Sequence, residues 1–421
     1  MLKKSVANFA MKNSPFRIGF MINPIAGMGG AVGLHGTDAG IHIEAAERGA
    51  IPISSQRASI ALSVLFSSPV WSNGSQEIEF LTPQGAMGGD LLQTFIDTDQ
   101  INKNQINQWQ IEFISHDTSG KSGSTSATDT KTIAKIFSDQ GVDLILFAGG
   151  DGTARDIFEV IQDSIPILGI PAGVKMRSGV FALYPAKAGE LLGRILSSGA
   201  GEKPVIRTQD AEILDLNEDS SDYSSSEFFG VAKTPYAPDL IQRSKSASSD
   251  SGAGALEELA IRYANTMKHT TLYLVGPGGS SNRILKALGL SLSPRGVHAI
   301  QGGKCIGEDI GEREIAQLVA RNSECELVVG VIGGQGYLFG RGNQQLSAAV
   351  IEAIGWSRIF IVASAEKLLE LMPTELHMDF NQPLRNPPPS FLQVHTSISR
   401  TVVCRLLYQV ASPSTSMQMR S

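Results

Sequence analysis

The sequence has few of the residues that mark secreted, metal-clustered or membrane-embedded proteins. Among its 421 residues are three cysteines, Cys305, Cys325 and Cys404, and no two of them form a CxxC pair. This scarcity argues against a disulfide framework and a cysteine-rich zinc site, and it suits a reducing compartment. No apolar run approaches the ~18 residues of a membrane span, and the segment 5–11 is too short for a signal-peptide core. The sequence therefore predicts a cytoplasmic protein with no membrane partner.

Positive charge is also in short supply. The chain carries 35 Lys and Arg against 41 Asp and Glu, a formal net charge of −6. This balance gives no electrostatic reason to expect nucleic acid as a partner. Small anionic substrates would need local capture by backbone amides and a few cations. The length of 421 residues indicates two domains, and the 42% of hydrophobic residues can supply their cores.

Strands alternate with helices over roughly the first half of the chain. Such alternation indicates an open, parallel, Rossmann-like α/β sheet. The predicted strands cover residues 17–22, 110–115, 142–148 and 166–170, and the predicted helices cover about 129–138, 154–162 and 186–196.

The pattern changes at Pro204, which divides the chain into an α/β domain over 1–203 and a second, mixed α/β domain over 204–421. The serine-rich stretches 218–227 and 243–254 lack apolar residues, so they are expected to be mobile loops. Alternation of helices and strands resumes beyond Leu256, with a glycine-rich loop predicted over 333–345.

The pentapeptide GGDGT stands where an open α/β sheet binds ligands, at the carboxyl end of a predicted strand and the start of a helix. Gly149 and Gly150 have no Cβ to keep phosphate oxygens away, and the amides of Gly152 and Thr153 can bind such oxygens at the helix N-terminus. Asp151 can bind Mg²⁺ or accept a proton from an attacking hydroxyl. The alternative is an ordinary turn in which the aspartate caps the helix, because short glycine motifs recur by chance.

A second glycine-rich loop, residues 26–40, follows the first predicted strand and offers amides to an anion. His35 lies inside it and is expected to be a weak phosphate contact. The stretch 115–122, SHDTSGKS, ends like a phosphate-binding loop but has Ser115 in place of the first glycine, which disfavours that interpretation. Four residues that follow the first predicted strand are predicted to bind the nucleotide: Asn23, Gly27, Gly29 and Gly30.

Five segments occur in an order that resembles a known family. They are INPIAGMGGAVGLHGTDAG, LFAGGDGTARDI, GIPAGVKMRSGVFALYP, GPGGSSNRIL and IGGQGYLFGRGNQQLS. The set, spanning about residues 16–371, resembles the ATP-NAD kinase-like proteins of the acetoin-catabolism protein X type, whereas GGDGT alone is shared with phosphofructokinases and diacylglycerol kinases. The resemblance implies transfer of a phosphoryl group from ATP or polyphosphate to the 2'-hydroxyl of NAD. It assigns Asp151 as catalytic carboxylate and Mg²⁺ ligand, with the neighbouring glycines and Thr153 on the phosphates.

The resemblance also implies nucleotide-binding residues elsewhere, each with a structural alternative. Asn217 and Glu218 lie roughly where NAD kinases place an Asn-Glu pair, or they form a strand-end turn. Gly276, Gly278, Gly279 and Ser280 match a second glycine-rich nucleotide segment, or a simple turn. Gly334, Gln335 and Gly336, with Arg341, Asn343, Gln344 and Gln345 nearby, line a loop at a strand end, or form a polar patch.

Some positions depart from the family pattern. Ala31 and His35 stand where many members carry Arg and Lys, and His298 stands where Asp is common. Loss of two cations would weaken phosphate binding or shift the preference between polyphosphate and ATP. The sequence thus predicts an NAD kinase-like enzyme that uses Mg²⁺, has its active site in the cleft between the domains, and is compatible with a homo-oligomer. The alternatives are a non-catalytic NAD- or ATP-binding sensor and a GGDGT kinase for another hydroxyl acceptor.

Overall fold

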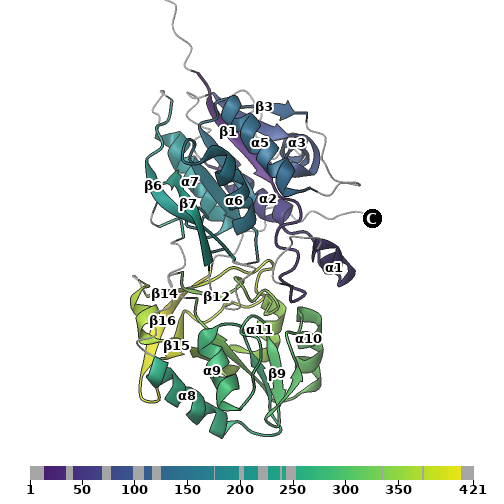
Figure 1. Cartoon of the computed structure of the whole chain (residues 1–421), viewed down its shortest axis with the longest axis vertical. Coiled ribbons are helices and arrows are strands. Elements are labelled where there is room, and N and C mark those ends of the chain that lie inside the picture. The colour runs from purple at the N-terminus through teal and green to yellow at the C-terminus, as the bar shows by residue number, and fades with distance from the viewer. Residues whose placement is uncertain are drawn as a thin grey trace, which may run out of the picture.

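The computed structural model describes most of the chain and leaves short segments undescribed. The described residues are 14–34, 41–68, 77–97, 109–115, 125–174, 176–198, 203–216, 226–237, 239–242, 253–332, 335–371 and 374–408. Figure 1 shows two bodies along the long axis, the N-terminal half above and the C-terminal half below.

A parallel sheet of five strands forms the centre of the N-terminal half, in the order β3-β2-β1-β4-β5. Every neighbouring pair runs parallel, which confirms the predicted open α/β sheet. The strands are β1 (Phe16–Ile22), β2 (Ile78–Pro83), β3 (Trp109–Ile114), β4 (Leu144–Gly149) and β5 (Ile167–Pro171).

Helices cover both faces of this sheet. In β1, Phe20 and Ile22 pack into one core and Met21 packs into the other, because successive side chains of a strand point to opposite faces. The first core also contains residues of α2 (Ser54–Phe66) and α7 (Pro185–Ser197), and the second contains residues of α5 (Ala127–Asp139) and α6 (Asp151–Ile161). The remaining elements of this half are α1 (Ile41–Glu47), η2 (Gly85–Met87) and α3 (Gly89–Asp97).

The order of strands predicted for the first half needs correction. The strand predicted over 110–115 is the third of the sheet, because β2 precedes it in the chain. β2 is not predicted from the sequence because it is only six residues long and has Glu79 at its second position, yet it pairs with both β1 and β3.

A two-stranded antiparallel hairpin, β6 (Thr208–Leu216) and β7 (Ser226–Pro235), follows the first sheet. Its buried residues Ala211, Ile213 and Ala232 join the same core as Ile157 and Phe158 of α6. The packed core of the N-terminal half therefore continues past residue 203.

The C-terminal half is built on a mixed nine-stranded sheet in the order β10-β9-β8-β11-β13-β15-β16-β14-β12. β8, β11, β13 and β15 run parallel, while β9 and β16 run antiparallel to β8 and β15. The strands are β8 (Leu272–Val275), β9 (His298–Gln301), β10 (Lys304–Gly307), β11 (Cys325–Gly330), β12 (Tyr337–Phe339), β13 (Ile359–Val362), β14 (Glu375–Met378), β15 (Phe391–His395) and β16 (Thr401–Tyr408).

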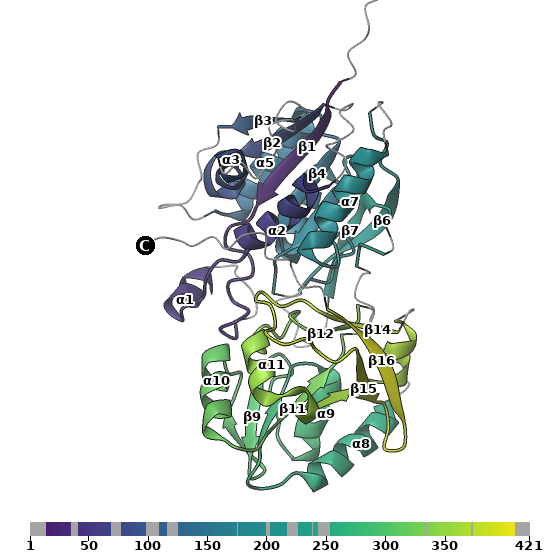
Figure 2. The same ribbon diagram turned by 180° about the vertical axis from the view of Figure 1, so that it is seen from behind.

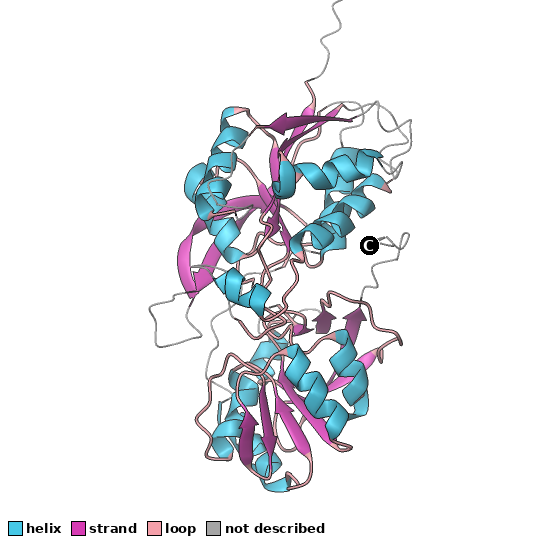
Figure 3. Cartoon of the chain, turned by 90° about the vertical axis from the view of Figure 1, so that its right-hand side faces the viewer, coloured by secondary structure: helices cyan, strands magenta, loops and turns pink. Residues whose placement is uncertain are grey.

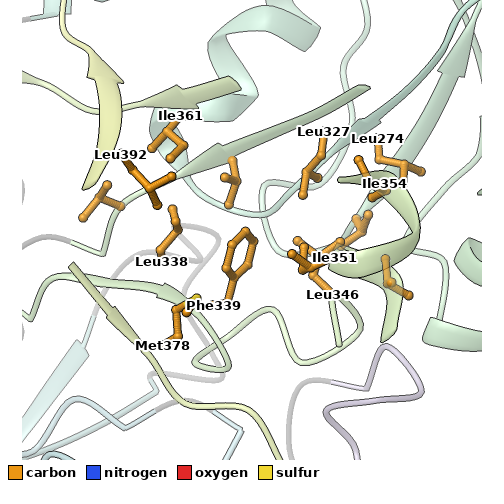
Figure 4. Packing of buried hydrophobic residues seen from close by; sticks show 14 of the residues in the cluster. Leu274, Leu327, Leu338, Phe339, Leu346, Ile351, Ile354, Ile361, Met378 and Leu392 are labelled. Atoms are coloured by element: carbon orange, nitrogen blue, oxygen red, sulfur yellow. The ribbon is translucent and has the colours of Figure 1, made fainter. Parts of the chain in front are cut away.

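Helices again flank the sheet on both sides, as the lower body of Figure 3 shows. Phe339 lies in the middle of one buried cluster, among Leu338, Leu346, Ile351 and neighbouring apolar side chains (Figure 4). The helices are α8 (Ala253–Thr266), α9 (Gly279–Ala287), α10 (Glu312–Arg321), α11 (Ala348–Ile354), η4 (Trp356–Arg358) and α12 (Ala365–Leu369).

The loops predicted for the second half are shorter than expected. β12 lies inside the predicted loop 333–345, and its side chains are fully buried against the core. The serine-rich stretches lie mostly outside the described residues, but β7 begins at Ser226 and α8 begins at Ala253, so the ends of both stretches are ordered. Among the described helices, none has the length and apolar character to cross a bilayer.

The two halves meet through a buried polar interface, which lies between the upper and lower bodies of Figure 2. The hydroxyl of Tyr184, at the start of α7, lies 2.6 Å from Nδ1 of His377 in β14. Burial, with a smaller contribution from the charge of Arg341, lowers the pKa of His377 to about 4. His377 is therefore neutral at pH 7, and its Nδ1 can accept a hydrogen bond from the hydroxyl of Tyr184.

This pairing predicts a pH-dependent stability. Unfolded histidine has a pKa near 6.5, so between about pH 6.5 and 4 only the unfolded chain takes up the proton. Stability should fall as the pH drops through this window, by roughly 1–3 kcal/mol for this residue. His377→Asn keeps an acceptor near Nδ1 and does not titrate, so its urea midpoint should vary less over that window. Equal slopes for the two proteins would contradict the assignment.

Candidate active site

The GGDGT segment forms the turn from β4 into α6. β4 is buried along its whole length, and α6 begins at Asp151 with Gly150 in extended conformation as its N-cap. GGDGT thus lies where it was predicted, at the carboxyl end of a strand and the start of a helix. Asp151 is 6% exposed, so its carboxylate needs hydrogen-bond donors from the protein in place of water.

Three donors hold the carboxylate of Asp151. The backbone N–H of Arg177 donates to Oδ2 at 2.7 Å, while the N–H and the hydroxyl of Ser178 donate to Oδ1 at 3.0 and 2.7 Å. Burial, with a smaller contribution from the charge of Asp215, raises the pKa of Asp151 to about 7 against the effect of these bonds. A carboxylate has about four acceptor positions, so one remains for a further ligand.

Cations and a second carboxylate surround this group. Burial lowers the pKa of Arg177, while Asp151 and Asp215 oppose the change and Arg295 of the C-terminal half favours it. Asp215, near the end of β6, forms an ion pair of 2.7 Å with Arg155 of α6. Both halves of the chain therefore bring charge to the neighbourhood of Asp151.

The glycines of GGDGT have a packing role. A methyl group at Gly150 would lie 3.0 Å from Cα of Gly173, and one at Gly149 would lie 2.5 Å from the hydroxyl oxygen of Thr153. The turn after β4 thus packs backbone to backbone against the turn after β5. The sequence pattern relates these glycines only to phosphate, and the close packing of the two turns is a second reason for glycine here.

The loop after β1 joins the same site. The amide of Asn23 donates to the hydroxyl of Thr153 at 3.0 Å. Gly27 has φ +80°, and a methyl group there would lie 2.0 Å from the carbonyl oxygen of Ala172. Gly30 lies against the side chain of Gln344 from the C-terminal half. Three of the four loop residues predicted to bind nucleotide therefore contact the other loops.

Gly27→Ala is expected to lower stability by roughly 1–3 kcal/mol and to disturb the loop, since both the positive φ and the Ala172 carbonyl oppose a side chain. Gly49→Ala is the matched control: it has φ +84° but nothing within 4 Å of the new methyl group. Urea denaturation compares the two variants. A cost for Gly27→Ala no larger than that for Gly49→Ala would disprove the close packing.

The polar residues predicted around 335–345 lie in the domain interface, where Gln344 is half-buried and the others are buried. The amide of Gln335 donates to Met176 O at 2.9 Å, and that of Gln344 donates to Val174 O at 2.6 Å. Gly336, at φ +73°, lies close to the carbonyl of Glu375. The structure therefore uses these side chains to hold the 173–178 segment, and Arg341, Asn343 and Gln345 are buried alongside them.

The GPGGSS loop lies at the carboxyl end of β8 and opens α9. Gly278 donates its N–H to Pro294 O at 2.9 Å, and the hydroxyl of Ser281 donates to Gly276 O at 2.7 Å. Lys367 of α12 donates to the hydroxyl of Ser280 at 3.2 Å, and burial lowers its pKa. A methyl group on Gly279 would have no atom within 4 Å. This loop carries a cation and open space beside a helix N-terminus.

Several predicted residues lie outside the described part of the chain: His35, Asn217, Glu218, Gly334 and most of 115–122. His298 is buried, with Nδ1 accepting from Asp309 N at 3.3 Å and Nε2 2.7 Å from Ser293 O. This pairing places its proton on Nε2 and gives the residue a structural role.

The described residues contain no group of three or more His, Cys, Asp or Glu that could enclose a metal ion. Mg²⁺ does not need such a cage, because it commonly takes one or two carboxylates together with substrate phosphates and water. Asp151, with one acceptor position left, fits that manner of binding.

Both domains of a known kinase family match the chain. The model of the ATP-NAD kinase N-terminal domain matches residues 18–200, and that of the ATP-NAD kinase C-terminal domain matches residues 265–406. The chain belongs to the ATP-NAD kinase family. Comparisons with individual curated proteins and with solved structures gave no match. Membership confirms the resemblance found in the sequence and supports an NAD kinase-like phosphotransferase.

In this ATP-NAD kinase family member, the residues that support Asp151 could not be identified from the sequence. Arg177 and Ser178 lie in the quoted segment GIPAGVKMRSGVFALYP, but nothing in it showed that they face residue 151. Arg57, Gln242 and Asp379 carried no local signal at all, because their partners are distant in the sequence.

Proposed function

We propose that the chain phosphorylates the 2'-hydroxyl of the adenosine ribose of NAD, with ATP or polyphosphate as donor, giving NADP. The observation that carries this proposal is Asp151: a buried carboxylate with a pKa near 7, at the turn of a glycine-rich segment, with loops from both halves nearby. A general base works best when its pKa lies near the working pH.

In the proposed reaction the ribose oxygen forms a bond to the transferred phosphorus, and the bond from that phosphorus to the bridging oxygen of the donor breaks. The ribose proton moves to Asp151, while ADP or a shortened polyphosphate leaves. Arg177 N–H and Ser178 hold the carboxylate in one orientation while it accepts this proton. Mg²⁺ bound to the donor phosphates would neutralise charge on the transferred group, while the one open acceptor position of Asp151 receives the ribose proton.

The glycine-rich turns would bind the phosphates. Gly152 and Thr153 present amides at the start of α6, where the helix dipole favours an anion. Gly279 and Ser280, beside Lys367, offer a second site of the same kind at the start of α9. The three free cysteines suit the cytoplasm, where we place the reaction.

The non-catalytic sensor remains the second candidate, since three of the four acceptor positions of Asp151 are already occupied by protein donors. One assay separates the two. The purified protein is incubated with NAD, Mg²⁺ and either ATP or polyphosphate, and NADP is measured with an NADP-specific dehydrogenase. NADP above a protein-free control supports the kinase, whereas nucleotide binding without NADP supports the sensor.

A further inference from the structure

Gln242 is a buried side chain close to the catalytic carboxylate, and sequence analysis gave it no role. It is 3% exposed and follows a short antiparallel bridge between Ile241 and Ala182. Its own backbone N–H donates to Phe181 O at 2.9 Å. The backbone at this position is therefore fixed before its side chain makes any contact.

The amide of Gln242 has a single possible orientation. Oε1 accepts from Nη1 of Arg341 at 3.1 Å, and Nε2 donates to the carbonyl oxygen of Ser178 at 2.8 Å. An arginine only donates and a carbonyl only accepts. If the amide were rotated by 180°, its NH₂ group would face the donor of Arg341 and its oxygen would face the carbonyl oxygen of Ser178. Both neighbours thus hold the side chain in place.

These bonds form a continuous chain between the two halves of the molecule. Arg341 is 2% exposed and is itself fixed by Asp379 Oδ2 at 2.7 Å, by Leu183 O at 3.0 Å and by the ring of Tyr337. Gln242 links this guanidinium to the carbonyl of Ser178. The N–H and hydroxyl of the same serine donate to Asp151.

We propose that Gln242 is a positioning residue for Asp151, fixing the Ser178 donors so that the carboxylate faces the acceptor hydroxyl; the proposal rests on the phosphotransfer proposed above. Packing alone does not require an amide here, since methionine has nearly the same length and no need for partners. A buried amide is costly unless both its ends are paired, and this one has a partner at each end.

The test compares Gln242→Met with Gln301→Met. Gln301 in β9 also donates from Nε2 to a backbone carbonyl, that of Thr270 at 3.0 Å, and to Asn322 Oδ1 at 3.1 Å. We expect Gln242→Met to lower kcat by about 10- to 100-fold with KM for NAD and donor nearly unchanged. Gln301→Met should keep the wild-type kcat. Melting curves confirm that both variants are folded.

A double variant shows whether the effect passes through Ser178. Gln242→Met combined with Ser178→Ala should lower kcat by less than the product of the single effects, because both changes act on the same donors. Should Gln242→Met fail to fold, Arg341→Lys is measured instead, since lysine keeps the charge beside Asp379 and loses the fork that reaches Gln242. It is expected to lower kcat at unchanged KM.

The outcomes are separable. An inactive wild type overturns the proposed function and the role of Gln242 with it. An active wild type overturns the positioning role alone if Gln242→Met matches Gln301→Met in kcat, if only KM changes, or if its effect multiplies fully with that of Ser178→Ala. Where Arg341→Lys is measured in place of Gln242→Met, an unchanged kcat also overturns the positioning role of Gln242.

Discussion

Asp151→Asn is expected to lower kcat by about 10²–10⁴-fold or more, because asparagine cannot accept the proton of the acceptor hydroxyl. Loss of the negative charge also weakens the electrostatic attraction of Mg²⁺ on the donor phosphates to this site, which adds to the effect. Nucleotide binding should persist, since the glycine amides that would hold the phosphates do not depend on this carboxylate. Steady-state kinetics and nucleotide titration of the folded variant measure the two effects separately.

The structure adds a stability cost to this substitution. Asp151 accepts from Arg177 N on one oxygen and from both Ser178 donors on the other. Asparagine offers one oxygen and one NH₂ group, so the NH₂ group must face a donor in a buried place. The cost is about 1–3 kcal/mol. The variant should therefore fold but melt below the wild type.

A control on the same helix makes the kinetic result specific. Asp156 is as buried as Asp151 and its pKa is also raised by burial, but it pairs with Arg155 and Lys131 on the side of α6. Asp156→Asn should lose stability and keep kcat. If Asp151→Asn retained activity within a few-fold of wild type, Asp151 would be a turn residue and the proposed mechanism would fall.

The Asp151 turn can be predicted from the sequence because its signal is local. A buried apolar run, two glycines and an amphipathic segment lie next to one another in the chain, and together they specify strand, turn and helix. The parallel sheet followed from the same alternation. β2 could not be predicted in this way, because a strand of six residues with a glutamate at its second position has too little periodicity to be recognised without its partners.

The support of the site could not be predicted because it depends on distant pairs. Ser178 is 27 residues from Asp151, Gln335 is 159 residues from Met176, and Arg57 is 322 residues from Asp379. Nothing in one sequence shows which of many polar residues meet across such separations. The residues around 335–345 drew attention as a polar patch, but only the folded chain shows that they face the 173–178 segment.

Asp379→Asn is expected to cause the largest loss of stability of any change considered, about 3–5 kcal/mol. Oδ2 of Asp379 lies 2.5 Å from Nη2 of Arg57 and 2.7 Å from Nε of Arg341, and all three side chains are buried. Arg57 comes from α2 of the N-terminal half, whereas the other two belong to the C-terminal half. Asparagine would leave two buried guanidinium groups without the charge that compensates them.

The pH dependence of this loss identifies its cause. Burial raises the pKa of Asp379, but Arg57 and Arg341 outweigh burial and hold it below the ordinary value. A lowered pKa in the folded chain gives stability that is complete above the unfolded pKa and is lost as the pH falls through the folded one. The difference between wild type and Asp379→Asn should therefore shrink in acid, where both side chains are neutral.

Asp239→Asn is the matched control for Asp379→Asn in urea denaturation. Its pair with Arg194 has a similar distance, 3.0 Å, but both side chains are more than half exposed. The cluster of Arg57, Asp379 and Arg341 also adjoins the site, because Nε of Arg57 donates to the carbonyl of Pro171 at the start of the segment that holds Asp151.

Solvent screens the exposed pair of Asp239 and Arg194, and its removal should cost about 0–1 kcal/mol. An equal cost for Asp379→Asn and Asp239→Asn would show that the buried cluster does not hold the halves together.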